Sequence, residues 1–392
     1  MGLEETLSWP FFDDGHRRFA EALARWADAT LTALPHADLD AACRARVKAL
    51  GEGGFLKAVV PAEHGGLNRA LDVRTLCLAR DILAFRDGLS DFAFAMQGLG
   101  TASISLFGSP ALKARYLPPV RDGRAIAAFA LSEPDAGSDV AALATTAKPD
   151  GPAHLRIDGT KTWISNGIKG SCFALLVKTD PQASPRYKGM SLFVAPKGPG
   201  FTVGKKFDKL GYKAIDAAEL VFDDYRIPAA NLIGAVEGQG FFQATGGLEL
   251  GRINVAARGV GVSEGALRLA TEYAQIRKTM GKPIAEHQAI QLKLGEMVTR
   301  ARAARLLTFD AAEAYDRGDR SDMEAGMAKY FASEAAVRNS EEAMRIFGGY
   351  SYSKEYEIER YYRDALFMCI AEGTNEMQRM IIAKQWLKRN AI

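Results

Sequence analysis

The chain has 392 residues, of which 48% are hydrophobic and 25% are charged, and its formal net charge is only +3 at pH 7. This length is too great for one ordinary hydrophobic core and predicts two or three packed domains. The near-balance of charge argues against a nucleic-acid-binding protein, and no apolar run approaches the ~18 residues that a membrane-spanning helix needs.

Three regions of different hydrophobic pattern follow one another along the chain. Residues 12–122 are rich in Ala, Leu and Arg at helical spacing, which predicts helices broken at the glycine-rich stretches 51–54 and 61–66. Between residues 125 and 232 the pattern changes to short alternating runs with an Asp158-Gly159 turn, which is typical of an antiparallel sheet or small barrel. After Gly240 long helical stripes return and predict a four-helix bundle.

We therefore expect an α+β multidomain protein. Its predicted parts are an N-terminal all-α domain (residues 1–124), a middle antiparallel β-barrel domain (residues 125–236) and a C-terminal four-helix bundle (residues 237–392). The histidines and cysteines are scattered without the spacing of metal ligands or of disulfide frameworks, so we expect no metal centre, free thiols and a reducing, cytoplasmic compartment. The cysteines are Cys43, Cys77, Cys172 and Cys369.

Two segments of the predicted β region have features of a cofactor site. Residues 128–139 form a predicted strand that runs into a Pro/Gly turn rich in backbone donors and hydroxyls, which suits a phosphate or a polar ring edge. Residues 162–167 place Trp163 two positions before the hydroxyl of Ser165. Together the two segments are suited to a flat heterocycle, although a Gly-Ser turn and a strand tryptophan also occur in proteins that bind no cofactor.

A single carboxylate near the C-terminus is the candidate catalytic group. Glu372 follows the apolar run 365–371 and precedes Gly373, so we expect its side chain in a water-poor wall, with backbone beside it that can approach a ligand closely. This arrangement suits a base that removes a proton from carbon. The alternative is a helix end capped by Gly373, with Glu372 in solvent.

With these residues in view, the chain resembles the acyl-CoA dehydrogenase family over nearly all of its length. The resemblance rests on both β-region segments, on the C-terminal segment 363–379, and on residues 277–288 and 346–350, in the family's order. It implies a helical, β, helical domain order, FAD as cofactor, and α,β-desaturation of an acyl-CoA thioester. It also implies an electron-transferring flavoprotein as acceptor, with neither a nucleic acid nor a membrane as partner.

The resemblance also implies roles for individual residues near the C-terminus. Glu372 matches the base, and its own backbone N–H matches a donor to the thioester oxygen. Some relatives carry the base just before the arginine that corresponds to Arg252, but here that position is Gly251, which leaves Glu372 as the candidate. The positions that match the substrate channel are Ser138, Glu249, Arg252, Ala371 and Gly373.

The cofactor residues implied by the family fall into two groups. The first would contact FAD within one chain and comprises Phe129, Leu131, Ser132, Gly137, Ser138, Trp163, Ile164, Ser165, Thr374 and Glu376. The second matches positions that reach the FAD of a neighbouring subunit and comprises Arg277, Thr279, Met280, Gln288, Arg345, Gly348 and Gly349. We therefore expect at least a dimer, and a dimer of dimers, that is a homotetramer.

Several positions depart from the family pattern. Met280 replaces a phenylalanine, Arg345 stands where glutamine is common, and Ala371 replaces a tyrosine beside the base, which opens space for a branched or cyclic acyl group.

Two other functions remain open. One is an acyl-CoA oxidase or a flavin monooxygenase-like enzyme on the same fold, and the other is a catalytically silent assembly partner.

Overall fold

The structure is a computed structural model that describes residues 2–35 and 38–391, without the side chains of residues 248 and 249. Its first part, up to residue 121, is helical. The helices are α1 (Leu3–Leu7), α2 (Asp14–Thr30), α3 (Leu39–Glu52), α4 (Val73–Arg86), α5 (Gly88–Phe107) and α6 (Pro110–Arg121). Their N-termini follow the expected chemistry, since Asp13, Asp72 and Asp87 each accept backbone hydrogen bonds at the start of a helix.

The middle part is a curled seven-stranded sheet with strand order β1-β4-β2-β3-β7-β6 and β5 paired with β4. The strands are β1 (Ala127–Ala130), β2 (Thr146–Pro149), β3 (His154–Ser165), β4 (Cys172–Lys178), β5 (Met190–Ala195), β6 (Phe201–Lys206) and β7 (Ala217–Pro228). Most pairings are antiparallel, as predicted. The β1–β4 and β2–β4 pairings are parallel, because β4 returns between two strands that precede it in the chain.

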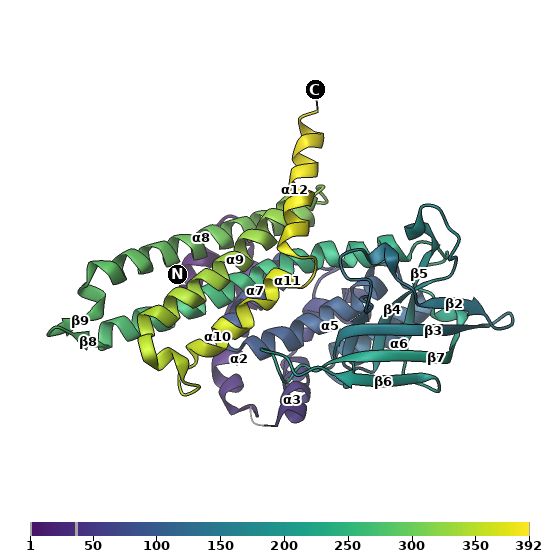
Figure 1. The fold of residues 1–392 in the computed structure, drawn as a ribbon, viewed down its shortest axis with the longest axis horizontal. Coiled ribbons are helices and arrows are strands. Elements are labelled where there is room, and N and C mark those ends of the chain that lie inside the picture. The colour runs from purple at the N-terminus through teal and green to yellow at the C-terminus, as the bar shows by residue number, and fades with distance from the viewer. Residues whose placement is uncertain (1, 36–37, 392) are drawn as a thin grey trace.

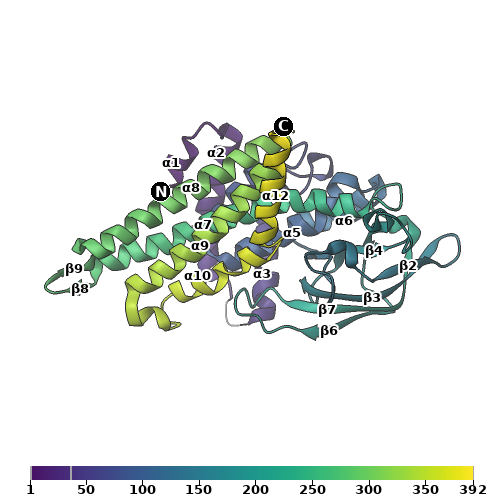
Figure 2. The same ribbon diagram turned by 45° about the horizontal axis from the view of Figure 1, so that its top comes forward.

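The C-terminal part is built on three long helices that lie side by side in both ribbon views (Figures 1 and 2). The elements are α7 (Gly240–Ile276), β8 (Lys278–Thr279), β9 (Lys282–Pro283), α8 (Gln288–Asp316), α9 (Asp322–Phe347), α10 (Ile358–Ala365), α11 (Phe367–Ile370) and α12 (Asn375–Arg389). Helix α4 packs on α7 and α8, so the two helical parts form one continuous body. Helix α12 packs on α9 at its start and then projects from the body (Figure 1).

The predicted fold class is confirmed, since the chain has an N-terminal helical part, a middle sheet and a C-terminal helical part. The four cysteines are free thiols. None of the described helices is long and apolar enough to cross a membrane.

A cluster of buried charges joins the helices of the two helical parts. Arg80 of α4 and Arg258 of α7 both pair with Asp91 of α5, and all three side chains are almost fully buried. A second buried pair joins Arg305 of α8 to Asp81 of α4, with 3.0 Å between Nε and Oδ2. Buried charges of this kind cost desolvation energy and depend on their partners, so removing one partner is strongly destabilising.

Candidate active site

Glu372 lies in the short turn between α11 and α12. Its backbone is left-handed, with φ +54°, and Gly373 after it is also left-handed, with φ +84°. A non-glycine residue in this region costs about 1–2 kcal/mol, so the surrounding contacts must hold it there. Helix α11 ends at Ile370, and Oε2 of Glu372 is buried without a hydrogen-bond partner in the described part of the chain. The alternative of a solvated helix-end carboxylate is therefore wrong.

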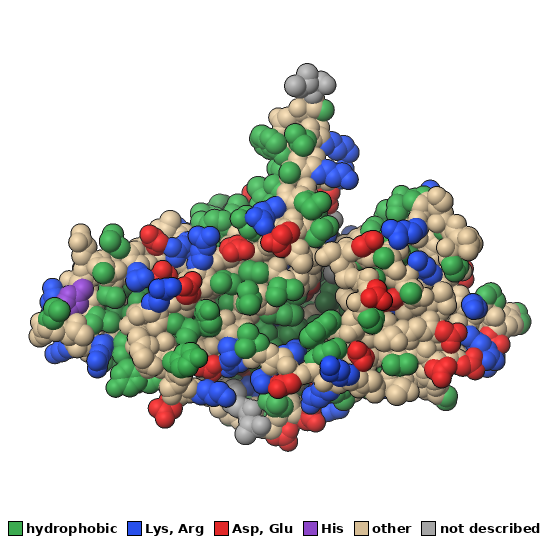
Figure 3. Space-filling model, viewed as in Figure 1, with side chains coloured by type: hydrophobic (Ala, Val, Ile, Leu, Met, Phe, Trp, Pro, Cys, Tyr) green, Lys and Arg blue, Asp and Glu red, His purple; other side chains and the backbone are tan. Residues whose placement is uncertain are grey.

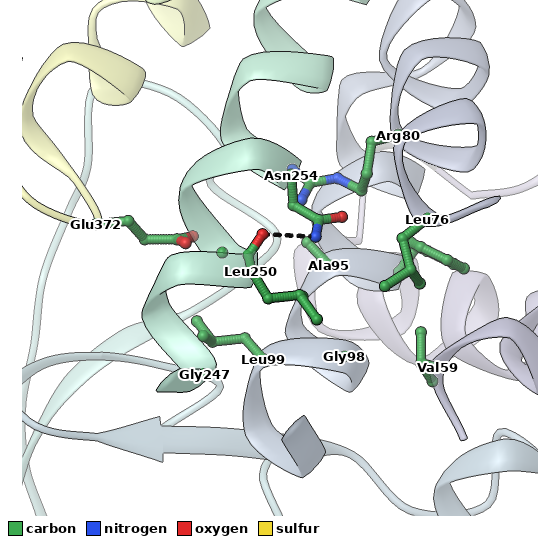
Figure 4. Close-up of a pocket in the computed structure, with 12 residues that line it drawn as sticks. Val59, Leu76, Arg80, Ala95, Gly98, Leu99, Gly247, Leu250, Asn254 and Glu372 are labelled. Atoms are coloured by element: carbon green, nitrogen blue, oxygen red, sulfur yellow. Dashed lines mark hydrogen bonds between the residues drawn. The ribbon is translucent and has the colours of Figure 1, made fainter. Parts of the chain in front are cut away.

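The carboxylate of Glu372 points toward α7 and is part of the lining of a cavity (Figure 4). A β-carbon built on Gly251 would overlap with Oε2, so the carboxylate occupies the space that a side chain at position 251 would fill. The cavity is walled mainly by apolar residues of α4, α5 and α7. Its lining consists of Val59, Leu76, Arg80, Phe94, Ala95, Gly98, Leu99, Gly247, Leu250, Gly251, Asn254 and Glu372.

The electrostatic surroundings of Glu372 act in opposite directions. Burial raises the pKa of the carboxyl group above its usual range, because the ionised form loses its hydration. The positive charges of Arg80 and Arg258, followed by Lys329 and Arg252, act against this and favour the ionised form. A carboxylate with a raised pKa is a stronger acceptor for a proton bound to carbon.

The backbone beside the carboxylate is also suited to catalysis. The N–H of Glu372 makes no hydrogen bond to any described residue. The N–H of Ala371, by contrast, donates to the Phe367 carbonyl at 2.9 Å, at the end of α11. A backbone N–H of this kind, next to a buried base, can donate to a developing negative charge on a carbonyl oxygen.

The two predicted cofactor segments of the sheet come together. The Ser132 carbonyl accepts a hydrogen bond from the Thr162 N–H at 2.9 Å. Lys161 is fully buried beneath them and donates to the Leu131 carbonyl at 3.0 Å and to Glu133 Oε1 at 2.7 Å. The end of β1 is therefore tied to the end of β3, although about 30 residues separate them in the sequence.

A stacked aromatic pair, Trp163 and Phe207, lies at this junction. The register of β3 against β7 shifts between Lys161 and Ile164, and Trp163 takes up a left-handed conformation with φ +58° that turns its ring outward. The ring is 60% exposed and stacks on Phe207, with 4.0 Å between ring centroids and 14° between planes. Because the Trp163 ring stays largely exposed although it stacks on Phe207, and its backbone holds it outward, it is suited to lie against the flat ring system of FAD.

The remaining residues of the first group surround this junction or the Glu372 turn. Phe129 and Leu131 are half-buried, and Gly137 and Ser138 are exposed in the turn after β1. Ile164 is buried and Ser165 is half-buried at the end of β3. Thr374 caps α12 by accepting a hydrogen bond from the Met377 N–H at 3.3 Å, and Glu376 is exposed and pairs with Arg379 at 2.9 Å.

The second group of cofactor residues lies at the far end of the bundle. The β8–β9 hairpin occupies the end of the molecule opposite the sheet in both ribbon views (Figures 1 and 2). Met280 at its tip is 94% exposed, and the Arg277 guanidinium lies 5.9 Å from the centroid of the Tyr350 ring. The single chain does not bring this group near Trp163 or Glu372. The exposed members of the group are Arg277, Thr279, Met280, Gln288, Arg345, Gly348 and Gly349.

The predicted substrate residues are less closely grouped. Arg252 is half-buried and follows Gly251 on α7. Ala371 precedes the base but is not among the residues that line the cavity. Gly373 has no room for a β-carbon, which would overlap with Nε2 of Gln378. Ser138 lies on the turn after β1, and the side chain of Glu249 lies outside the described residues.

Three polar residues of the site are missing from the sequence-based prediction. Arg80 and Asn254 line the cavity, and Lys329 lies buried on α9 behind the Glu372 turn. The sequence contains a signal for one of them. Lys329 falls on the alanine-rich stripe of α9 that includes Ala325, Ala328 and Ala332, where a charged residue interrupts an otherwise apolar face.

The chain is similar to known proteins in all three of its parts. Family models described as acyl-CoA dehydrogenase match in three consecutive pieces, the N-terminal domain at residues 13–124, the middle domain at 128–225 and the C-terminal domain at 238–387. An "Acyl-CoA dehydrogenase" of Bacillus subtilis is 41% identical over 87% of this chain and 89% of its own length. A "Cyclohexane-1-carbonyl-CoA dehydrogenase" of Geobacter metallireducens is 37% identical over 86% of this chain and 88% of its own.

A solved structure extends the similarity to three dimensions. A chain in the structure of the electron transferring flavoprotein of Acidaminococcus fermentans is 35% identical to this one, with a TM-score of 0.89 over 96% of this chain and 99% of that chain. The matches therefore cover the helical, sheet and helical parts alike. The chain belongs to the acyl-CoA dehydrogenase family of FAD-dependent oxidoreductases.

Proposed function

We propose that this protein oxidises an acyl-CoA thioester to the 2-enoyl-CoA, with Glu372 as the base, and passes the electrons to an electron-transferring flavoprotein. The observation that carries the proposal is the buried Oε2 of Glu372, which faces an apolar cavity and lacks a hydrogen-bond partner among the described residues. Similarity to a chain in the electron transferring flavoprotein structure supports the choice of acceptor.

Each step of the proposed reaction depends on particular residues of the chain. FAD, when bound, supplies the acceptor for the hydride that leaves the β carbon. The apolar walls on α4, α5 and α7 exclude water from the acyl group, and Glu372 removes the proton from the α carbon through a carboxylate oxygen. The Glu372 N–H donates to the thioester oxygen and stabilises the negative charge that develops there. Trp163, Ser132 and their neighbours at the end of the sheet would hold the flavin.

The cofactor prediction can be checked on the purified protein. We expect one non-covalent FAD per chain, because the junction of β1 and β3 exposes the Trp163 ring, which stacks on Phe207. Under anaerobic conditions a suitable acyl-CoA should bleach the flavin absorbance, and a panel of straight-chain, branched and ring-bearing thioesters should identify the preferred acyl group. A colourless protein that FAD cannot reconstitute would contradict the proposal. Rapid reoxidation of the reduced flavin by air would instead indicate an oxidase.

We also propose that the active enzyme is a homotetramer assembled as a dimer of dimers. The second cofactor group is suited to reach a flavin on another copy of the chain, since the β8–β9 hairpin lies at the end of the molecule opposite the sheet (Figure 1). The projecting helix α12 exposes apolar side chains, including Met380, Trp386 and Leu387, and Figure 3 shows hydrophobic side chains along it.

Sedimentation should therefore show a tetramer that carries full activity. Substitution of Arg277 by alanine should reduce FAD retention without changing the fold, because its side chain is exposed and its guanidinium lies over the Tyr350 ring, 5.9 Å from the ring centroid. A fully active monomer would contradict this assembly.

Two further proposals complete the functional assignment. We place the domain boundaries after residues 124 and 236, which fall between α6 and β1 and between β7 and α7.

We also propose a cytoplasmic location, supported by four free thiols in a chain of this size.

A further inference from the structure

The turn that carries Glu372 is held from behind by a buried lysine. Lys329 of α9 has a fully buried side chain, and its Nζ donates to the Gly373 carbonyl at 2.8 Å and to Asn375 Oδ1 at 2.9 Å. The amide of Gln378 donates to the same Gly373 carbonyl at 3.1 Å. A buried ammonium group costs desolvation energy unless its donors are used, and here two of them hold the residues that follow the base.

The first residue of α12 is held by the same stretch of α9. Ser333 Oγ donates to Asn375 Oδ1 at 3.1 Å, and Asn375 Nδ2 donates to Glu334 Oε1 at 2.8 Å. Asn375 thus accepts from Lys329 and Ser333 and donates to Glu334. The turn is therefore attached to α9 on its C-terminal side, directly after the two left-handed residues.

These contacts explain how the left-handed conformation of Glu372 persists. A non-glycine residue with positive φ relaxes unless its neighbours are fixed, and the Gly373 carbonyl is fixed by two donors from different helices. In this conformation the carboxylate enters the cavity at the position that Gly251 leaves open. Loss of the lysine would free the carbonyl and allow the base to leave that position.

Lys329 also acts on the base through its charge. Its positive charge favours the ionised form of Glu372 and lowers the pKa of that carboxyl group, while burial lowers the pKa of Lys329 itself to about 8. The other charged and titratable groups that act on Lys329 are Cys369, Glu376 and Arg252, and those that act on Glu372 are Arg80, Arg258 and Arg252.

We propose that Lys329 is a positioning residue for catalysis, which locks the Glu372–Gly373 turn and supplies a positive charge that keeps the base ionised. This inference rests on the proposed role of Glu372 as the base. It predicts two separable effects, one on the geometry of the turn and one on the protonation of the carboxylate, which a purely structural lysine would not combine.

Three variants separate these effects. Lys329→Met removes both the donor and the charge, Lys329→Gln keeps a donor but removes the charge, and Gln378→Leu removes a neutral donor to the same carbonyl. Glu372 must be ionised to act, and loss of a nearby cation raises its pKa. The acid limb of the kcat/KM profile should therefore move to higher pH in both Lys329 variants and stay in place in Gln378→Leu.

The loss of positioning should appear in rate and in backbone dynamics. We expect flavin reduction to slow by about 10²-fold in Lys329→Met, since misplacement of a catalytic group by about 1 Å costs that much. Amide hydrogen exchange at residues 371–374 should accelerate in Lys329→Met and in Gln378→Leu. Lys293→Met on α8 is the matched control, because Lys293 is half-buried and pairs with Glu342 away from the cavity.

The outcomes distinguish this inference from the proposed function. If wild-type flavin is not bleached by any acyl-CoA, the proposed function fails, and hydrogen exchange still decides whether Lys329 holds the turn. If wild type is bleached but the acid limb stays in place in both Lys329 variants, the charge effect is refuted. Unchanged exchange and unchanged rate in Lys329→Met would overturn the positioning role. If this variant does not fold, Lys329→Gln still tests the charge effect, and unchanged exchange in Gln378→Leu would show that donors to the Gly373 carbonyl do not hold the turn.

Discussion

Replacement of Glu372 by glutamine should slow flavin reduction by acyl-CoA by about 10²–10⁴-fold while FAD content is retained. Glutamine has the shape of glutamate but cannot accept a proton from carbon. Oε2 of Glu372 has no hydrogen-bond partner among the described residues, and the cavity beside it is lined mainly by apolar side chains. Stopped-flow measurement of the anaerobic half-reaction gives the rate directly.

The same variant should be at least as stable as wild type at neutral pH. Burial raises the pKa of Glu372 in the folded protein above its value in the unfolded chain. Between the pKa of the unfolded chain and that of the folded protein, the folded state binds more protons than the unfolded state. The free energy of unfolding of wild type therefore decreases as pH rises from about 4.3 through the raised pKa. Glutamine carries no such ionisation. Thermal unfolding at pH 5 and pH 8 should therefore show a smaller pH dependence in Glu372→Gln.

A matched control is Glu21→Gln on α2, whose carboxylate is exposed and pairs with Arg25 at 3.9 Å. Its rate should equal that of wild type. If Glu372→Gln reduces the flavin at a rate within about tenfold of wild type, another group removes the proton and the proposed mechanism is wrong.

Replacement of Gly251 by alanine should separate activity from stability. A methyl group at this position would overlap with the Glu372 carboxylate, which is the flexible end of a side chain and can rotate away. The base would leave its position, and we expect flavin reduction to slow by about 10²-fold. Alanine within α7 also restricts the unfolded backbone, so the folded state should gain about 0.5–1 kcal/mol from helix propensity.

The control for this variant is Gly295→Ala in α8. A β-carbon at Gly295 would meet no atom within 4 Å, so the same propensity gain comes without a steric conflict. We expect Gly295→Ala to be more stable than wild type and fully active. Kinetics and thermal unfolding of both variants test the idea, and Gly251→Ala with wild-type rates would show that the carboxylate tolerates displacement.

Much of the architecture follows from local sequence patterns. Helical stripes, alternating strand runs and glycine-rich breaks depend on neighbours within a few residues, so they indicate where helices and strands lie. The pattern did not reveal the parallel pairings of β4, because strand order depends on contacts between distant segments.

The sequence by itself offered Glu372, a glutamate before a glycine at the end of an apolar run, as a candidate base. The resemblance to the family implied position 251 as the competing place for a base, and Gly251 carries no side chain there. Only the tertiary structure showed that Glu372 and Gly251 lie next to each other. The carboxylate of Glu372 occupies the space that a side chain at position 251 would take. The same holds for Lys329, whose contacts with Gly373 and Asn375 span 44 and 46 residues. Contacts of this kind arise from packing between helices, and packing depends on the whole chain rather than on any local pattern.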